Sequence, residues 1–118
     1  MAFPQTTAQA GISRLRSSVV AAKLGDENVL CDLRTGTRYR LNRTAWAIVR
    51  LIQRNAASRE AVLMRCRQWG YVPFEREEIC RFLADLESFG LVEHGAPGKF
   101  PQVDLPLRWS TPVIELLP

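Results

Sequence analysis

The chain is short of the residue types that most catalytic and metal sites use. Its 118 residues include one histidine and three cysteines. The histidine, His94, has no neighbouring serine, cysteine or carboxylate pattern that would pair a nucleophile with a base. The sequence also has no glycine-rich phosphate loop and no group of side chains at metal-ligand spacing. We therefore expect a protein that is not an enzyme and that needs no cofactor or metal ion.

Long apolar runs are also missing, and the cysteines do not form a pattern typical of disulfides. No window reaches the roughly 18 apolar residues of a membrane span, and residues 1–11 lack the basic start and apolar run of a signal peptide. Cys31, Cys66 and Cys80 are an odd number, lie far apart and each fall inside an apolar strand or helix pattern. We expect reduced, buried thiols in a cytoplasmic protein without a membrane partner.

What is present fits one small domain with a single core. The chain is 47% hydrophobic and long enough to bury roughly two thirds of the surface that it exposes when unfolded. Its net charge of +4 comes almost wholly from arginine, because Lys23 and Lys99 are the only lysines. This balance permits an acidic partner without requiring one.

The first half of the chain predicts a three-stranded antiparallel meander. The expected strands are residues 18–24, 28–33 and 37–41. Gly36 lies in the second turn, where a positive φ suits glycine. In the third strand Tyr39 and Leu41 face one way, and Arg38 and Arg40 face the other.

Three helices are expected after the meander. They run from Asn42 to about Asn55, from Ser58 to Gly70, and from residues 73–75 to Gly90. Asn42 and Ser58 are suited to N-cap positions, and the two glycines are suited to helix ends. The third helix has the clearest apolar period, formed by Ile79, Phe82, Leu83, Leu86 and Phe89. A short strand or extended exit follows at residues 91–93.

Composition divides the chain into three parts. Residues 1–16 show no sustained period and are expected to form a loose N-terminal arm or an incomplete first strand. Residues 17–94 hold the expected strands and helices. Residues 95–118 are rich in proline and glycine, so no regular helix persists there and we expect a linker and a tail.

Strands, three helices and a basic charge also suit a winged-helix DNA-binding transcriptional regulator, which is the alternative function. In a helix-turn-helix the second helix of the pair enters the major groove and meets phosphates at close range. Here that helix, residues 75–89, carries five acidic side chains against two arginines. Because DNA phosphates repel such a face, we expect no nucleic-acid partner.

Capture of a peptide fits the same elements better. If the third strand lies at the edge of the sheet, its backbone groups can pair with an extended peptide, and the third helix can wall off the other side. About four backbone hydrogen bonds, each worth about 0.5 to 1.5 kcal/mol net, and two or three buried side chains would give micromolar binding. Since backbone pairing is unselective, apolar pockets would have to choose the ligand.

Residues 19–93 resemble the PqqD family, also called the RiPP recognition element. The resemblance covers about two thirds of the chain and rests on segments in a particular order and spacing. They are Leu24-Gly-Asp-Glu followed by Val29-Leu-Cys-Asp-Leu-Arg-Thr-Gly36, Tyr39-Arg-Leu-Asn42 before Thr44-Ala-Trp46, and Phe82-Leu-Ala-Asp-Leu-Glu87 before Gly90-Leu-Val-Glu93.

The resemblance implies a small α+β, winged-helix-like fold that acts as a peptide chaperone. Such a domain holds the leader of a ribosomally made precursor peptide between the third strand and the third helix, and presents it to modifying enzymes. In lasso peptide biosynthesis these would be a leader peptidase and a cyclase, and in other members a radical iron–sulfur enzyme. The implied peptide-binding residues are Thr37, Arg38, Tyr39, Arg40, Leu41, Glu78, Ile79, Arg81, Phe82, Asp85 and Leu86. Of these, Ile79, Phe82 and Leu86 fit an ordinary core equally well.

The tail is similar to the leader motif of many lasso peptides, an aromatic residue followed at fixed spacing by proline and leucine. Trp109, Pro112 and Ile114 stand at these positions, tryptophan in place of the usual tyrosine and isoleucine in place of leucine. Three accounts stay open: a leader-like segment joined to a recognition domain, a native tail that occupies its own groove, or a plain proline-rich extension. An extended linker of residues 95–107 would span on the order of 40 Å, which is enough to fold back.

Overall fold

The fold was analysed in a computed structural model that describes residues 13–53, 55–68, 76–95, 100 and 109–118. Within these residues, three helices and two antiparallel sheets confirm the predicted α+β class. The strands are β1 (Ser13–Leu15), β2 (Val19–Leu24), β3 (Glu27–Asp32), β4 (Thr37–Leu41), β5 (Val92–His94) and β6 (Ile114–Leu116). The helices are α2 (Arg43–Leu51), α3 (Arg59–Gln68) and α4 (Arg76–Ser88).

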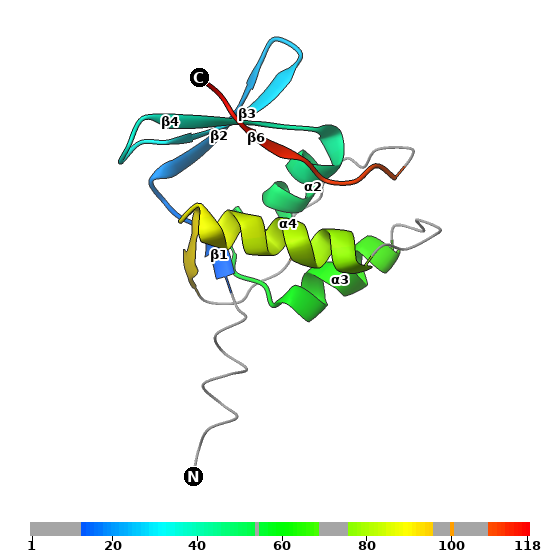
Figure 1. Ribbon diagram of the computed structural model, residues 1–118. Helices are drawn as coiled ribbons and strands as arrows, with labels where there is room; N and C mark the ends of the chain where they lie inside the picture. The colour runs from blue at the N-terminus through cyan, green and yellow to red at the C-terminus, as the bar shows by residue number, and fades with distance from the viewer. Residues whose placement is uncertain (1–12, 54, 69–75, 96–99, 101–108) are drawn as a thin grey trace.

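The larger sheet has the strand order β2-β3-β4-β6. Its first three strands are joined in sequence by two tight turns, and the second turn holds Gly36 at a φ of 75°. The fourth strand comes from the C-terminal tail, which pairs antiparallel with β4. The sheet is therefore a meander to which the far end of the chain adds one more strand (Figure 1).

A second, two-stranded sheet joins β1 to β5. Arg14 and Glu93 stand opposite each other in this pair, and an Nη2–Oε2 contact of 2.8 Å links their side chains. Leu15 is buried in the core with 2% of its surface exposed. Residues 13–15 of the expected arm thus form a short first strand, while residues 1–12 lie outside the described residues.

The predicted N-caps of the first two helices are confirmed. Asn42 Oδ1 accepts a hydrogen bond from the Ala45 amide at 2.9 Å, and Ser58 Oγ accepts one from the Ala61 amide at 3.1 Å. Each cap satisfies an N–H group that has no partner within its helix. The expected end of the second helix at Gly70 and the start of the third at residues 73–75 lie outside the described residues.

The predicted end of the first helix at about Asn55 is wrong, because α2 ends at Leu51. The backbone groups that follow are taken by β1. The Leu15 amide donates to the Ile52 carbonyl at 2.7 Å, and Ala57 exchanges two hydrogen bonds with Ser13 at 2.9 and 3.1 Å. The helix therefore stops where a strand from the N-terminal end of the chain offers its backbone better partners.

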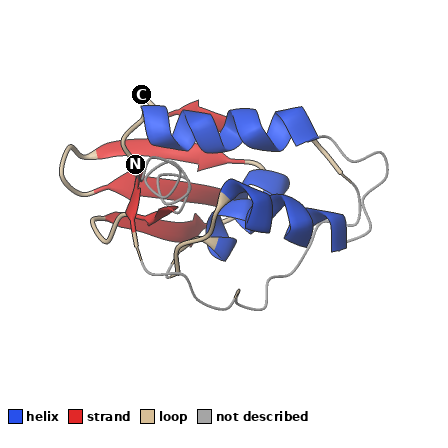
Figure 2. Ribbon diagram, turned by 90° about the horizontal axis from the view of Figure 1, so that it is seen from below, coloured by secondary structure: helices blue, strands red, loops and turns tan. Residues whose placement is uncertain are grey.

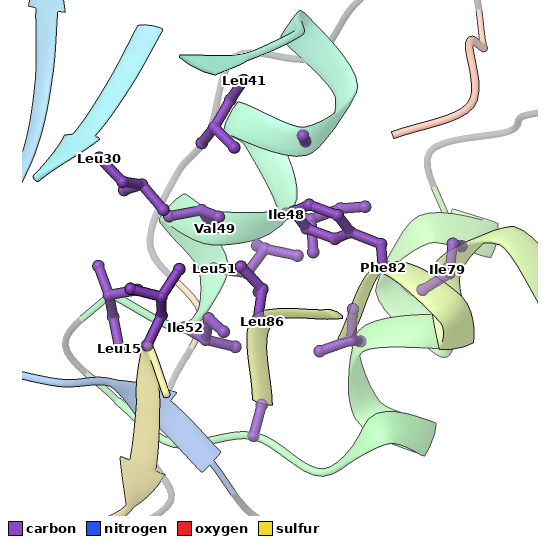
Figure 3. Packing of buried hydrophobic residues seen from close by; sticks show 14 of the residues in the cluster. Leu15, Leu30, Leu41, Ile48, Val49, Leu51, Ile52, Ile79, Phe82 and Leu86 are labelled. Atoms are coloured by element: carbon purple, nitrogen blue, oxygen red, sulfur yellow. The ribbon is translucent and has the colours of Figure 1, made fainter. Parts of the chain in front are cut away.

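The three helices cover one face of the large sheet and enclose the core. Figure 3 shows Leu30 of the sheet pointing toward Val49 of α2, Phe82 of α4 beside Ile48, and Leu86 of α4 beside Leu51. Figure 2 shows α4, the longest helix, running along one edge of the sheet. None of the helices in the described ranges has both the length and the apolar character needed to cross a bilayer.

Candidate peptide-binding site

β4 forms the floor of the candidate site, and its side chains alternate as the sequence predicts. Tyr39 and Leu41 are buried, whereas Arg38 and Arg40 are exposed. One side of the β4 backbone pairs with β3, and the other side pairs with β6. The strand therefore offers apolar side chains to the core and its backbone groups to the tail.

α4 lies beside this edge and contributes mainly to the core. Ile79, Phe82 and Leu86 are exposed by no more than 2%, and all three belong to the buried cluster that α2 and the sheet complete. Phe89, predicted as part of the same apolar stripe, is instead 43% exposed, and its ring stacks on that of Tyr39 with centroids 5.2 Å apart. This stacking joins the end of α4 to the middle of β4.

A hydrogen-bonded cluster holds the end of α4 against the turn that precedes β4. Gly90, at a φ of 71°, follows the helix, and its carbonyl accepts from Arg16 Nε at 2.8 Å and from Arg34 Nη2 at 3.0 Å. Arg34 also donates to both carboxylate oxygens of Asp32, at 3.2 and 3.0 Å. These side-chain hydrogen bonds lower the pKa of the buried Asp32 carboxyl, in spite of its desolvation. The spacing between α4 and β4 is thus set by several directional contacts.

The C-terminal tail occupies the free side of β4. In the β6 register, Leu116 stands opposite Tyr39 and Ile114 opposite Leu41. The pairing extends beyond the strand, because the Asn42 amide donates to the Val113 carbonyl at 3.2 Å and the Leu117 amide donates to the Arg38 carbonyl at 2.9 Å. Figure 1 shows this segment, orange to red, passing α2 and then following β4.

Polar side chains fix the part of the tail that precedes β6. The hydroxyls of Thr44 and Ser110 lie 2.8 Å apart, and the Thr111 hydroxyl donates to Glu78 of α4. Asn42 Nδ2 donates to the Thr111 carbonyl at 2.7 Å, and Asn42 Oδ1 accepts from the Val113 amide at 3.1 Å. The tail is therefore held by the start of α2 and by α4 as well as by β4.

The apolar residues of the tail divide into two groups. Pro112 is buried, and Trp109 and Ile114 are partly buried and pack against the core. Val113 and Leu116, by contrast, are 47% and 62% exposed. All three residues of the leader-like motif thus turn inward.

The structure places the sequence-predicted site residues unequally around the tail. Tyr39, Arg40 and Leu41 pair with β6 through their backbones, and the Arg38 carbonyl accepts a hydrogen bond from the Leu117 amide. Arg40 also forms an ion pair with Glu115 of the tail at 3.3 Å. Glu78 meets it by hydrogen bonding to Thr111. The others are Thr37, which pairs with Asp32 of β3, the core residues Ile79, Phe82 and Leu86, the exposed Arg81 and the half-buried Asp85.

Two residues that contact the tail were not among the predicted site residues. The sequence indicates Asn42 as an N-cap and places Asn42 and Thr44 in the motifs that carry the family resemblance, but it assigns neither residue to the site. Both lie at the junction of β4 and α2, where a strand edge passes into a helix start. A polar side chain at such a junction can form hydrogen bonds with a strand added to the sheet edge. A polar residue where a predicted edge strand passes into a helix start is therefore the sequence signal that would identify Asn42 and Thr44 as site residues.

Comparison with solved structures gives one informative match. The structure of TbiB1 in complex with the TbiA(beta) leader peptide is similar to this chain, with a TM-score of 0.52 and 27% sequence identity. The match covers 70% of this chain and 98% of the other. No family model matches the chain, and no curated protein matches it.

Proposed function

We propose that the chain is a recognition element of the PqqD type, which binds the leader of a ribosomally made precursor peptide by strand addition to β4. One observation carries the proposal: the tail pairs with β4, it buries Pro112, and it packs the half-buried Trp109 and Ile114 of the same leader-like motif against the core. The likeness to TbiB1, a protein solved with a leader peptide, supports the same function.

The seated tail indicates how a leader would be held. Its backbone would pair with β4 from the position of Val113 to that of Leu117. Net hydrogen-bond energies of about 0.5 to 1.5 kcal/mol each make this ladder a weak and unselective contribution. Selection would come from the proline and the two large side chains, because burying apolar surface contributes roughly 25 cal/mol per Å².

In this proposal the protein is an adaptor that binds the leader and performs no chemistry of its own. It holds the leader while an enzyme, such as a leader peptidase or another peptide-modifying enzyme, acts on the rest of the precursor. The spacing of Trp109, Pro112 and Ile114 favours a lasso peptide system. A winged-helix-like fold and a place in the cytoplasm belong to the same proposal.

The tail competes with any leader for β4. A tether of this kind gives an effective concentration of about 1 mM, so a site with micromolar affinity would be filled almost completely by its own tail. Either the tail is itself the leader-like ligand of this site, or it must be displaced before a separate leader can bind. Both cases predict that loosening the tail exposes a binding site.

A released-tail variant tests the proposal in the full-length chain. It carries Pro112→Asp and Ile114→Asp, which place carboxylates at two of the three inward positions of the motif. The matched control carries Val113→Asp and Leu116→Asp, which add the same charge at exposed positions. A synthetic peptide of residues 109–118 is then titrated into each protein by calorimetry.

The released-tail variant should bind the peptide with micromolar affinity, and the wild type and the control should bind it about 1,000-fold more weakly, because their tails compete at an effective concentration of about 1 mM. The affinity should change little with salt, whereas DNA binding by a winged-helix regulator would fall steeply as salt rises. Absence of saturable peptide binding to the released-tail variant would refute the proposal.

A further inference from the structure

Asn42 stands at the point where β4 can no longer pair with an added strand. It is extended, with φ −77° and ψ 177°, and the next residue, Arg43, begins α2. From Arg43 onward the backbone groups form hydrogen bonds within the helix, and the chain leaves the edge of the sheet. An added strand that continues past this point would lose its backbone partners on β4.

The Asn42 side chain takes the place of the missing backbone. A carboxamide carries one carbonyl acceptor and N–H donors, the same groups as a peptide unit. Nδ2 donates to the Thr111 carbonyl at 2.7 Å, and Oδ1 accepts from the Val113 amide at 3.1 Å while it also caps α2 through the Ala45 amide at 2.9 Å. The row of hydrogen bonds between β4 and the tail thereby extends to the Val113 amide and the Thr111 carbonyl.

These two groups flank Pro112, which has no N–H of its own. In an antiparallel pair the backbone groups that point toward the neighbouring strand belong to every second residue. The groups of Thr111 and Val113 therefore point toward β4, and the backbone nitrogen of the intervening residue points away from it. A proline at this position costs the ladder nothing.

We propose that the Asn42 carboxamide is the residue that sets the register of a bound leader, a role that rests on the proposed function. A slip of one residue would bring Pro112 to the place of Val113, where Asn42 Oδ1 requires an N–H donor. Proline there would leave that acceptor without its partner. We call these two side-chain hydrogen bonds, from Asn42 to the Thr111 carbonyl and from the Val113 amide to Asn42, the Asn42 clamp. The clamp admits proline at position 112 and excludes it from position 113. It thereby aligns Trp109 and Ile114 with the core.

Asn42→Asp separates the clamp from the helix cap. Aspartate caps a helix about as well as asparagine and keeps an oxygen acceptor, but it offers an oxygen instead of an N–H donor to the Thr111 carbonyl. Asn42→Ser keeps the cap and removes the carboxamide. Gln53→Glu, just beyond the other end of α2, makes the same amide-to-acid change and is the matched control.

Amide hydrogen exchange in the full-length variants reads out the clamp. Protection of the Leu117 amide, just beyond the far end of β6, should fall about tenfold in Asn42→Asp and in Asn42→Ser, and stay near wild type in Gln53→Glu. The Leu15 amide, bound to Ile52, reports the fold and should keep its protection. Unchanged protection of Leu117 in both Asn42 variants would overturn the proposal.

A second measurement leaves Asn42 in place. A peptide of residues 109–118 with an ester in place of the Pro112–Val113 amide lacks the N–H that Asn42 accepts, and it should bind the released-tail variant about tenfold more weakly than the parent peptide. An ester at the Ser110–Thr111 link, which leaves the Thr111 carbonyl and both backbone groups of Val113 unchanged, is the control. Equal affinities of the two esters would contradict the clamp.

The two readouts distinguish failure of this inference from failure of the proposed function. If no peptide binds in trans, leader binding is refuted, while exchange at Leu117 still decides whether Asn42 clamps the tail. If peptides bind but neither the Asn42 variants nor the esters differ from their controls, leader binding stands and the register is set elsewhere.

Discussion

Replacing Pro112 by alanine should loosen the tail without unfolding the domain. Pro112 is buried in the seated tail, and the change to alanine removes two ring methylenes. At about 0.8 kcal/mol per buried methylene this contributes about 1.6 kcal/mol. The unseated tail also gains backbone freedom worth about 0.4 to 1 kcal/mol.

Together these effects weaken the seating of the tail by about 2 to 2.5 kcal/mol, which is a factor of about 30 to 70 in the equilibrium. Hydrogen exchange at the Leu117 amide, which donates to the Arg38 carbonyl at 2.9 Å, measures that equilibrium. Val113→Ala is the control, because Val113 is 47% exposed. The reasoning is refuted if Leu117 exchanges equally fast in both variants, or at the wild-type rate in Pro112→Ala.

The remaining predictions concern the scaffold around the site. The pKa of Asp32 is lowered in the folded state, so its contribution to stability is present above about pH 4 and is lost as the pH falls through the folded pKa. In Asp32→Asn, the free energy of unfolding measured by denaturation should therefore fall less steeply with decreasing pH than in the wild type. The same pH dependence in both proteins would contradict this prediction. Phe82→Ala should lower the free energy of unfolding by about 3 to 5 kcal/mol in urea titrations, and a loss below about 1 kcal/mol would contradict its place in the core. Burial raises the pKa of the Cys66 thiol to about 12, so at pH 8 it should react with a thiol reagent far more slowly than Cys31 and Cys80, which are half-buried; equal rates would count against this burial.

Local chemistry made the strands and the helix starts predictable. The alternation of Tyr39 and Leu41 with their charged neighbours is a property of the strand itself, and the caps at Asn42 and Ser58 act within one turn of their helices. The end of α2 was not predictable in this way. It depends on hydrogen bonds from β1, which lies far away in sequence, and no local pattern encodes that partner.

The candidate site was predictable to a similar extent. The apolar period of α4 shows which face is buried, yet a core and a peptide-binding groove give the same period. The core role of Ile79, Phe82 and Leu86 follows only from their packing against α2 and the sheet. The contribution of Asn42 and Thr44 depends on where the tail lies. A sequence shows the donors and acceptors of such residues but not the segment that they meet.

The most direct test of the account is whether a separate peptide restores protection to the β4 edge. In the released-tail variant, the Asn42 backbone amide, which otherwise donates to the Val113 carbonyl, should exchange quickly. Addition of the peptide of residues 109–118 should slow its exchange in a saturable way, with a midpoint at the dissociation constant measured by calorimetry. Peptide binding that leaves the Asn42 amide unprotected would contradict strand addition at β4.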